Sequence, residues 1–349
     1  MLSKLFPFGL TLLLVACGGG SGGSAPATTP AVATPAVTPS LAVAIPSASY
    51  PAGSAELGGW TTLQQARVLC GFGALKQNLQ LDAAALAHAR YLTNKSIAST
   101  VSVLSHYERN ASNLPDTGNP DYTGEYPWDR TSHQGYGTQV AEILQATVWN
   151  YNIANPPVFP TMEQRGADSM LSLLNTVYHL MGAMYHGADV GFGADMKTAA
   201  SGSARREEYR FGSLNGYQTQ RTRLGTGNLA TYPCEGSSNI PPAFAPADES
   251  PNPFPAMTSS SQMMGSPIYL KVDAGQVLTL TSSNISTGGV SVATATLTQT
   301  NDPQAEIGAN EVFVVPTSAL RANTNYQVNL AGTINNTPFS RSFAMRTGS

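Results

Sequence analysis

Residues suited to chemistry are few in this sequence. Its 349 residues include 5 histidines and 3 cysteines. They are His88, His106, His133, His179 and His186, with Cys17, Cys70 and Cys234. No His-Glu-x-x-His zinc motif is present, and the cysteines form no closely spaced metal-binding pair. A catalytic or metal site would therefore have to be assembled by tertiary folding from residues far apart in the chain.

Charge is also scarce. Charged residues make up 11% of the chain, against roughly 25% in an average soluble protein. Lys and Arg number 18 and Asp and Glu 21, a net charge of -3. This balance excludes a basic nucleic-acid binder and a polybasic membrane-binding surface. The 42% hydrophobic content predicts folded cores, and the low charge favours work outside the cytoplasm.

The N-terminus has the pattern of an export signal. Met1–Lys4 carries one positive charge, and Leu5–Ala16 is an apolar run too short to span a bilayer. The run ends in Leu-Val-Ala followed by Cys17, which resembles the lipobox of bacterial lipoproteins. The resemblance implies a signal peptide at residues 1–17, with Cys17 acylated and inserted in a membrane. A plain secretory signal that happens to contain a cysteine is the alternative.

A tether is expected after this cysteine. Gly18 stands where some lipoproteins have Asp, and by resemblance to Gram-negative lipoproteins it implies transfer to the outer membrane. Residues 18–55 carry no charge and are rich in Gly, Thr and Pro. Such a segment buries too little apolar surface to fold. We therefore expect a disordered tether that holds the folded part away from a lipid surface in the cell envelope.

The two remaining cysteines are candidates for a disulfide. In an oxidising compartment, unused thiols most often pair. A Cys70–Cys234 bridge would tie the first predicted helix to the end of the first folded region. Two buried free thiols are the alternative.

The first folded region, residues 56–235, mixes helices and strands. Apolar spacing predicts helices over 61–76 and 83–94, the second with Asp82 as N-cap. Thr161 and Gln164 form a capping-box pattern for a long helix reaching about Tyr185. Short strands are expected over 189–192 and 208–214. Because helices and strands do not alternate regularly, the pattern indicates an α+β fold.

The second folded region has a different period. Residues 236–255 are Pro-rich and are expected to be a linker. From 256 to 349, apolar and polar residues alternate in runs at 268–272, 277–281, 290–298, 312–315, 326–330 and 339–345. Six or seven strands in about 90 residues predict a small all-β sandwich of immunoglobulin-like size. The region has no His or Cys, so a spacer or adhesion module is favoured over a catalytic one.

Four stretches of the first region resemble the CAP superfamily, which includes the cysteine-rich secretory proteins, antigen 5 and pathogenesis-related 1. The stretches are 63–92, Leu104-Ser105-His106, 121–143 and 175–193, in the family's order and spacing. The third contains Asp129-Arg130, Gly135-Tyr136 and Ala141-Glu142-Ile143, and the fourth contains Asn175-Thr176-Val177-Tyr178-His179. The resemblance spans roughly residues 60–235 and implies an α-β-α sandwich with a cleft lined by His and Glu.

Carried over by position, the cleft residues are His106, Glu142 and His179. Glu142 lies in Ala-Glu-Ile where the family often has Gly-Glu-Asn, and the family's second Glu falls near Thr176. Glu108 is a candidate replacement for that second Glu. Each residue also has a simpler interpretation: His106 as a surface residue, Glu142 as an ordinary helix carboxylate and His179 as a core histidine. Arg130 is expected to hold a loop through an ion pair.

Three functions remain open at this point. The resemblance implies a non-catalytic envelope protein that binds a lipid, glycan or protein in the cleft. A hydrolase is the second, because two imidazoles and a carboxylate can act as acid and base or hold Zn²⁺ with an open position. A purely structural envelope protein is the third.

Overall fold

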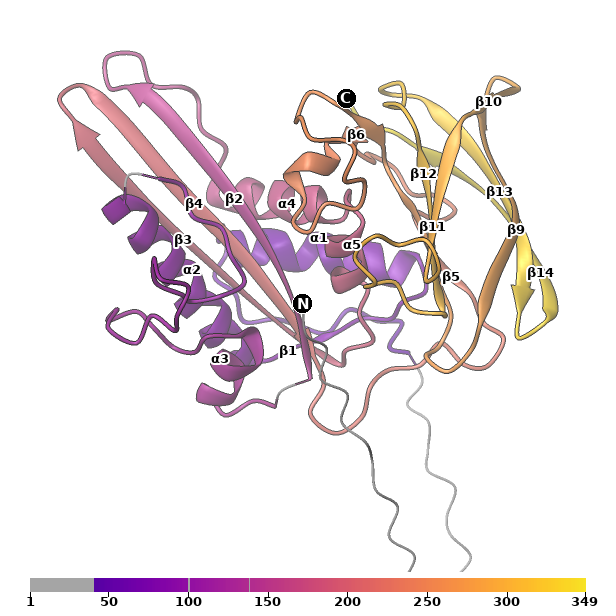
Figure 1. The fold of residues 1–349 in the computed structure, drawn as a ribbon, viewed down its shortest axis with the longest axis horizontal. Helices are drawn as coiled ribbons and strands as arrows, with labels where there is room; N and C mark the ends of the chain where they lie inside the picture. The colour runs from indigo at the N-terminus through magenta and orange to yellow at the C-terminus, as the bar shows by residue number, and fades with distance from the viewer. Residues whose placement is uncertain (1–40, 100, 138) are drawn as a thin grey trace, which may run out of the picture. The chain divides into compact units, whose positions relative to one another are not determined.

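A computed structural model of the protein describes residues 41–99, 101–137 and 139–349 (Figure 1). The predicted signal peptide, Cys17 and the tether as far as residue 40 lie outside the described residues. The described chain belongs to one compact unit and combines helices with several sheets. The predicted α+β class is therefore confirmed.

The first half is built on a four-stranded sheet of order β1-β3-β4-β2. Its strands are β1 (Lys76–Gln77), β2 (Val140–Asn152), β3 (Asp189–Ser201) and β4 (Ala204–Gly216). The helices are α1 (Ala55–Leu69), α2 (Leu79–Ser99), α3 (Pro127–His133), α4 (Met162–Leu173) and α5 (Tyr178–Ala183). Figure 1 shows α2 and α3 on one side of the sheet and α1, α4 and α5 on the other.

Glycines allow helices to lie very close to their neighbours. A Cβ on Gly193 of β3 would lie 2.1 Å from the backbone nitrogen of Leu86 in α2. A Cβ on Gly166 of α4 would lie 1.8 Å from the carbonyl oxygen of Ala55 in α1. Both contacts are with backbone atoms, which cannot move aside as a side chain can. Only glycine therefore permits this packing on the two sides of the sheet.

The first two helices begin earlier than the sequence predicts. Helix α1 starts at Ala55, where the Ser54 side chain accepts a hydrogen bond from Leu57 N at 3.2 Å. Helix α2 starts at Leu79, and Asn78 rather than Asp82 accepts the first free N–H groups. Asp82 instead accepts a hydrogen bond from Phe192 N at 2.8 Å, and so joins α2 to β3.

The segment predicted as the end of the tether is packed against the folded body. Tyr50 is partly buried against the core, and its hydroxyl donates to Asp82 at 2.6 Å. Its ring lies 5.9 Å from the ring of Trp60. The tether prediction is therefore wrong for residues 41–55, because aromatic burial there outweighs the flexible composition.

The predicted long helix after Thr161 is divided in two. The capping box of Thr161 and Gln164 is present, but α4 ends at Leu173 and α5 begins at Tyr178. Residues 140–152, for which the sequence predicts no particular element, form β2, which pairs with β4 along its whole length. Glu142 therefore lies on a strand and not on a helix.

The second half contains two four-stranded sheets of order β10-β9-β13-β14 and β11-β12-β8-β5. Their strands are β5 (Ala230–Tyr232), β8 (Ile268–Lys271), β9 (Leu278–Thr287), β10 (Val290–Val292), β11 (Thr294–Thr298), β12 (Glu311–Pro316), β13 (Asn325–Ile334) and β14 (Thr337–Arg346). A separate pair joins β6 (Ala243–Phe244) to β7 (Met264–Gly265), and η1 (Pro246–Asp248) is a short 3-10 turn. The period-two alternation therefore located most strands correctly.

The predicted boundary between the regions needs two corrections. β5 lies within the range assigned to the first region, yet it pairs with β8 of the second. Residues 236–255 are not a free linker, since they include β6 and the fully packed Glu249. One hydrophobic core crosses the boundary: Tyr269 of β8 stacks on Phe72 at 6.1 Å and on Phe313 at 4.6 Å. The two halves therefore share a core.

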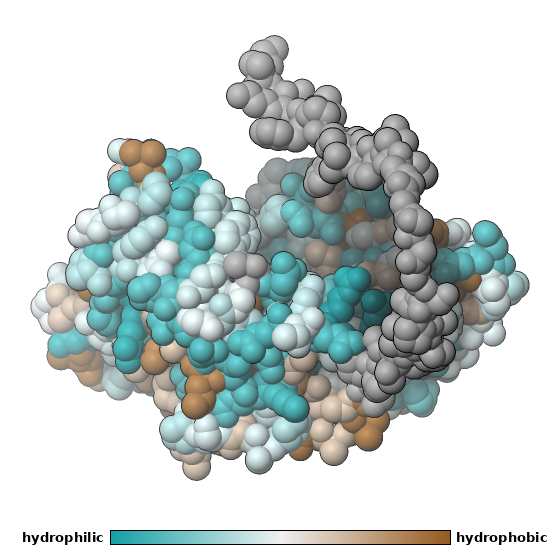
Figure 2. Space-filling view, turned by 90° about the horizontal axis from the view of Figure 1, so that it is seen from below, coloured by the Kyte–Doolittle hydropathy of each residue, from teal (hydrophilic) through white to brown (hydrophobic). Residues whose placement is uncertain are grey.

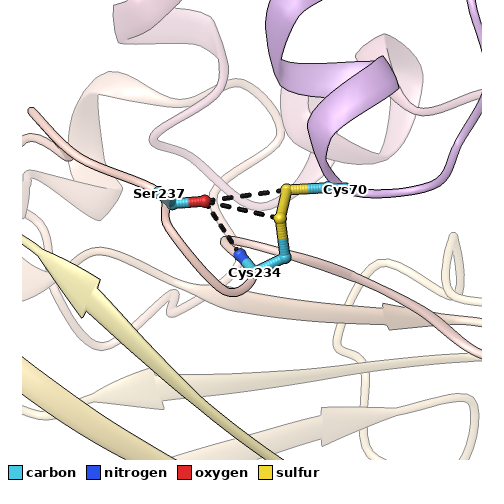
Figure 3. Close-up of a disulfide and its surroundings, with 3 residues drawn as sticks. All are labelled: Cys70, Cys234 and Ser237. Atoms are coloured by element: carbon cyan, nitrogen blue, oxygen red, sulfur yellow. Dashed lines mark hydrogen bonds between the residues drawn. A yellow bond between two sulfur atoms is a disulfide. The ribbon is translucent and has the colours of Figure 1, made fainter.

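Cys70 and Cys234 form a disulfide (Figure 3). It joins the C-terminal end of α1 to Cys234, which follows β5 and Pro233, across a sequence separation of 164. Ser237 Oγ accepts a hydrogen bond from Cys234 N at 3.0 Å beside the bridge. The disulfide therefore adds a covalent link between the two halves, which the shared core already holds together.

Within the described ranges, no helix is long and apolar enough to cross a bilayer. Figure 2 shows one face, on which hydrophilic residues predominate and hydrophobic residues form small patches.

Candidate functional site

An open cleft of about 390 Å³ lies between β2, α5 and the Pro-rich segment of residues 236–255. His106, Glu142 and His179 all line it. Tyr107 and Trp128 form part of one wall, and Pro251 and Glu306 come from the second half of the chain. The volume falls within the ~300–1,000 Å³ typical of small-molecule sites.

Glu142 is held by two partners at the base of the cleft. Arg130 Nη2 donates to Oε1 at 2.7 Å and to Oε2 at 2.8 Å. His106 Nδ1 lies 2.9 Å from Oε2. The Glu142 side chain is 2% exposed and that of Arg130 is fully buried, whereas that of His106 is 32% exposed. Arg130 thus forms the predicted ion pair, with Glu142 as its partner.

The charge state of Glu142 follows from this environment. Burial is the largest single effect and disfavours the ionised form, but the charge of Arg130, together with the effects of His88 and of His106 and its hydrogen bond, outweighs burial. The pKa of Glu142 is therefore well below its usual value of 4.5. Because the carboxylate only accepts, His106 Nδ1 is the donor. In the tautomer with this hydrogen on Nδ1, Nε2 is an acceptor.

His179 has a different carboxylate partner. Its Nδ1 lies 3.0 Å from Thr176 Oγ1 and 3.3 Å from Glu249 Oε1. The buried Glu249 also accepts hydrogen bonds from the first backbone N–H groups of α5, those of Val177 at 2.9 Å, Tyr178 at 2.6 Å and His179 at 3.1 Å. Glu249 therefore fixes both the start of α5 and the imidazole that α5 carries.

Sequence reasoning missed Glu249. One signal was available: Asp248 and Glu249 are the only charged residues in the Pro-rich range 236–255. A lone charged pair in such a segment predicts a specific partner. Its partner could not be named without the fold, because α5 lies about 70 residues earlier.

Glu108 is not the cleft residue that the sequence analysis expects. It is fully buried and does not line the cleft. Its Oε1 lies 2.9 Å from His88 Nδ1, and its Oε2 accepts from Thr123 N at 2.7 Å and Gly124 N at 3.3 Å. The reason is that the Glu108 side chain is directed into the loop after His106, where it binds backbone N–H groups and holds the loop in place.

These contacts connect into one buried polar network. Arg130 Nε lies 3.9 Å from Glu108 Oε1, whereas Arg130 Nη2 binds Glu142. The sequence of partners is therefore His88, Glu108, Arg130, Glu142 and His106. Two carboxylates flank one guanidinium, and an imidazole stands at each end. The network links β2, α2 and α3 to the loop that follows His106.

The predicted ligands His106, Glu142 and His179 do not fit a zinc site. No group of three or more His, Cys, Asp or Glu in the described ranges is arranged to hold a metal ion. Both oxygens of Glu142 already accept from Arg130, and a cation beside a guanidinium is disfavoured. His106 and His179 contact separate carboxylates, with no hydrogen bond between the two groups among the described residues. The predicted metal ligands share a cleft without converging on a common point.

The arrangement also differs from a hydrolytic triad. A carboxylate-oriented imidazole requires a nucleophile hydrogen-bonded to its other nitrogen. Ser250 is the cleft-lining serine, and the described structure has no hydrogen bond between it and either imidazole. The cleft can therefore offer hydrogen-bond acceptors and aromatic surface to a ligand.

No protein-family model matches this chain, and no curated protein matches it either. The site must consequently be interpreted from its geometry.

Proposed function

We propose that this chain is a lipid-anchored protein of the bacterial cell envelope, related to the CAP superfamily, that binds a ligand in its cleft without catalysing a reaction. The three residues selected by resemblance line one cleft, and this observation carries the proposal. The helices on both faces of the first sheet are consistent with the α-β-α sandwich that the resemblance implies.

Binding is favoured over hydrolysis by the state of Glu142. A general base must be free to accept a proton near neutral pH. Arg130 keeps Glu142 ionised and occupies both of its oxygens, so this carboxylate is a poor proton acceptor. Its evident effect is to orient His106.

The second half supports an immunoglobulin-like module. Two four-stranded antiparallel sheets and a core of alternating residues are what such a module requires. In this proposal the module also completes the binding site, because Glu306 lines the cleft, as does Pro251 of the preceding Pro-rich segment. A mere spacer would not be expected to contribute residues there.

Export is supported by the disulfide between Cys70 and Cys234. Disulfides persist in oxidising compartments such as the bacterial periplasm. Acylation of Cys17 would then hold the protein at a membrane, and the outer membrane follows from Gly18 as proposed above.

An unbiased ligand search tests the binding proposal. The full chain carrying Cys17→Ser is incubated with a small-molecule extract of bacterial envelopes, and retained compounds are identified by native mass spectrometry. Ala141→Trp fills the cleft from β2, and Ala199→Trp places the same ring on β3 outside it. The expected result is a compound retained by the parent chain and by Ala199→Trp but lost from Ala141→Trp. Equal retention by all three proteins, or by none, contradicts the proposal.

Hydrolysis is tested with the same proteins. Peptide, ester and glycoside substrates are screened with the parent chain, His106→Ala and His179→Ala. Activity that is present in the parent and lost in both variants would establish the hydrolase instead.

A further inference from the structure

Two aromatic rings on the cleft wall are more exposed than core packing explains. Tyr107 and Trp128 are each 44% exposed and line the cleft. Between them lies Tyr126, whose ring is parallel to that of Trp128 at 4.7 Å and edge-on to that of Tyr107 at 5.5 Å. Since Tyr126 covers one face of the indole, the exposed part of Trp128 is its other face and its edge.

The aromatic wall is held rigidly. The Arg109 guanidinium lies 4.6 Å from the Tyr107 ring centre and 5.5 Å from that of Tyr126, and Nη2 donates to the Tyr126 hydroxyl at 2.9 Å. Glu125 accepts from Arg109 Nε at 2.6 Å. The buried Glu108 carboxylate binds the backbone of the same loop. A wall fixed in this way loses little conformational entropy when a ligand stacks on it.

The floor of the cleft offers acceptors. Nδ1 of His106 lies beside Glu142, and Nδ1 of His179 lies beside Thr176 and Glu249, so in the tautomer with hydrogen on Nδ1 each ring has Nε2 as an acceptor. Within the described residues, neither Nε2 atom has a hydrogen-bond partner. Acceptors of this kind select a ligand that carries O–H or N–H donors. Phosphate and carboxylate ligands, which present acceptors, are disfavoured.

We propose that the cleft binds a pyranose ring of a glycan, stacked on the exposed face of Trp128, with hydroxyl groups donating to His106 and His179. A pyranose has an apolar C–H face and a rim of hydroxyls, which matches an aromatic wall beside two acceptors. A fatty acid would need a continuous apolar lining, whereas this lining includes two imidazoles and two carboxylates. The pairing of Glu142 with Arg130 leaves the floor suited to an uncharged ligand.

This inference rests on the proposed function and specifies its ligand class. The test uses the full chain with Cys17→Ser, titrated with the trimers of N-acetylglucosamine and of glucose and followed by tryptophan fluorescence and calorimetry. Choline and myristate are titrated in parallel as representatives of a cationic and a lipid ligand. Saturable binding of at least one trimer is expected, with no binding of choline or myristate.

Variants locate the binding. Trp128→Ala is expected to raise Kd about tenfold, because a stacked aromatic ring contributes roughly 0.5–1.5 kcal/mol beyond its buried area. Trp128→Phe should retain most of the affinity. Tyr151→Ala, an aromatic deletion on β2 outside the cleft, should leave Kd unchanged. Far-UV circular dichroism verifies that each variant is folded, as expected for a half-exposed Trp128.

Several outcomes overturn the inference. They are the absence of trimer binding at millimolar concentration, an unchanged Kd in Trp128→Ala, and binding of choline or myristate in place of a trimer. Failure here is distinguishable from failure of the proposed function. A non-saccharide compound retained by the parent and lost in Ala141→Trp refutes the glycan and leaves the binding cleft standing.

Discussion

Replacing Arg130 with methionine tests the buried network beneath the cleft. Arg130 is fully buried, and Nη2 binds both oxygens of Glu142. Nη1 also donates to the carbonyl oxygens of His106 at 3.1 Å and Glu125 at 3.4 Å. The substitution keeps a long side chain and removes the charge. Glu142 then remains buried with His106 as its partner.

The expected cost is about 3–5 kcal/mol in the free energy of unfolding at pH 7, the usual penalty for leaving one member of a buried ion pair alone. Removing both charges should cost much less. The double variant Arg130→Met with Glu142→Met is expected to be more stable than Arg130→Met, because the carboxylate that Arg130 binds directly is removed, while Glu108 keeps its hydrogen bonds from Thr123 N and Gly124 N.

Urea unfolding followed by circular dichroism measures these differences. Arg205→Met is the matched control, since its guanidinium binds only exposed carbonyls in the hairpin between β3 and β4 among the described residues. Its cost should stay within about 0.5 kcal/mol. A loss below about 1 kcal/mol for Arg130→Met, or a double variant as unstable as the two single variants added, would refute the reasoning.

The pH dependence gives a second test of the same pair. Burial raises and Arg130 lowers the pKa of Glu142, with a net lowering. A carboxyl with a lowered folded-state pKa contributes stability above its ordinary value and loses it as the pH falls through the lowered one. The difference between the parent and Arg130→Met should therefore be largest near neutral pH and shrink below about pH 4. A difference independent of pH would show that Glu142 is not the group affected.

Four further perturbations follow from the structure. Glu249→Ala removes the acceptor of three backbone N–H groups and should cost at least about 3 kcal/mol, with faster hydrogen exchange at the start of α5; unchanged exchange there would contradict the assignment. Gly166→Ala should cost more than about 3 kcal/mol in urea unfolding because its Cβ would overlap the backbone of α1, while Gly118→Ala, with open space around it, should be nearly neutral; equal costs would refute the close packing. Cys70→Ser should lower stability by about 2–5 kcal/mol, and no loss would mean that the bridge does not constrain the chain. Cys17→Ser should move the exported protein from the membrane fraction to the soluble fraction, whereas continued membrane association would argue against a lipid anchor.

Local signals in the sequence were reliable where neighbouring residues decide the structure. The Thr161 and Gln164 capping box depends on a three-residue spacing, and α4 begins there. Strand β13 of the second half follows from alternation, because buried and less buried residues alternate along it. β2 escaped prediction since Ala, Glu, Leu and Gln in its sequence are helix formers, and its thirteen pairs with β4 override that preference.

Where the folded body begins, and the role of Glu249 at the start of α5, depended on contacts between distant segments. Tyr50 belongs to the folded body because Trp60 and Asp82 receive it. The predicted single helix after Thr161 is interrupted where Glu249 binds the N–H groups of α5. Composition describes a segment without describing what lies beside it, so neither result could be obtained from a Pro-rich or helix-rich pattern.

The sequence by itself determined which groups were available: five imidazoles, three thiols, low charge and two regions of different period. It also named three of the residues that line the cleft, His106, Glu142 and His179, through their resemblance to a family. Only the tertiary structure decided which partner each group has. Glu142 pairs with Arg130, His179 with Glu249 and Glu108 with His88. The physical reason is range: hydrogen bonds act at about 3 Å and ion pairs at about 4 Å, and such distances are set by folding and not by separation along the chain.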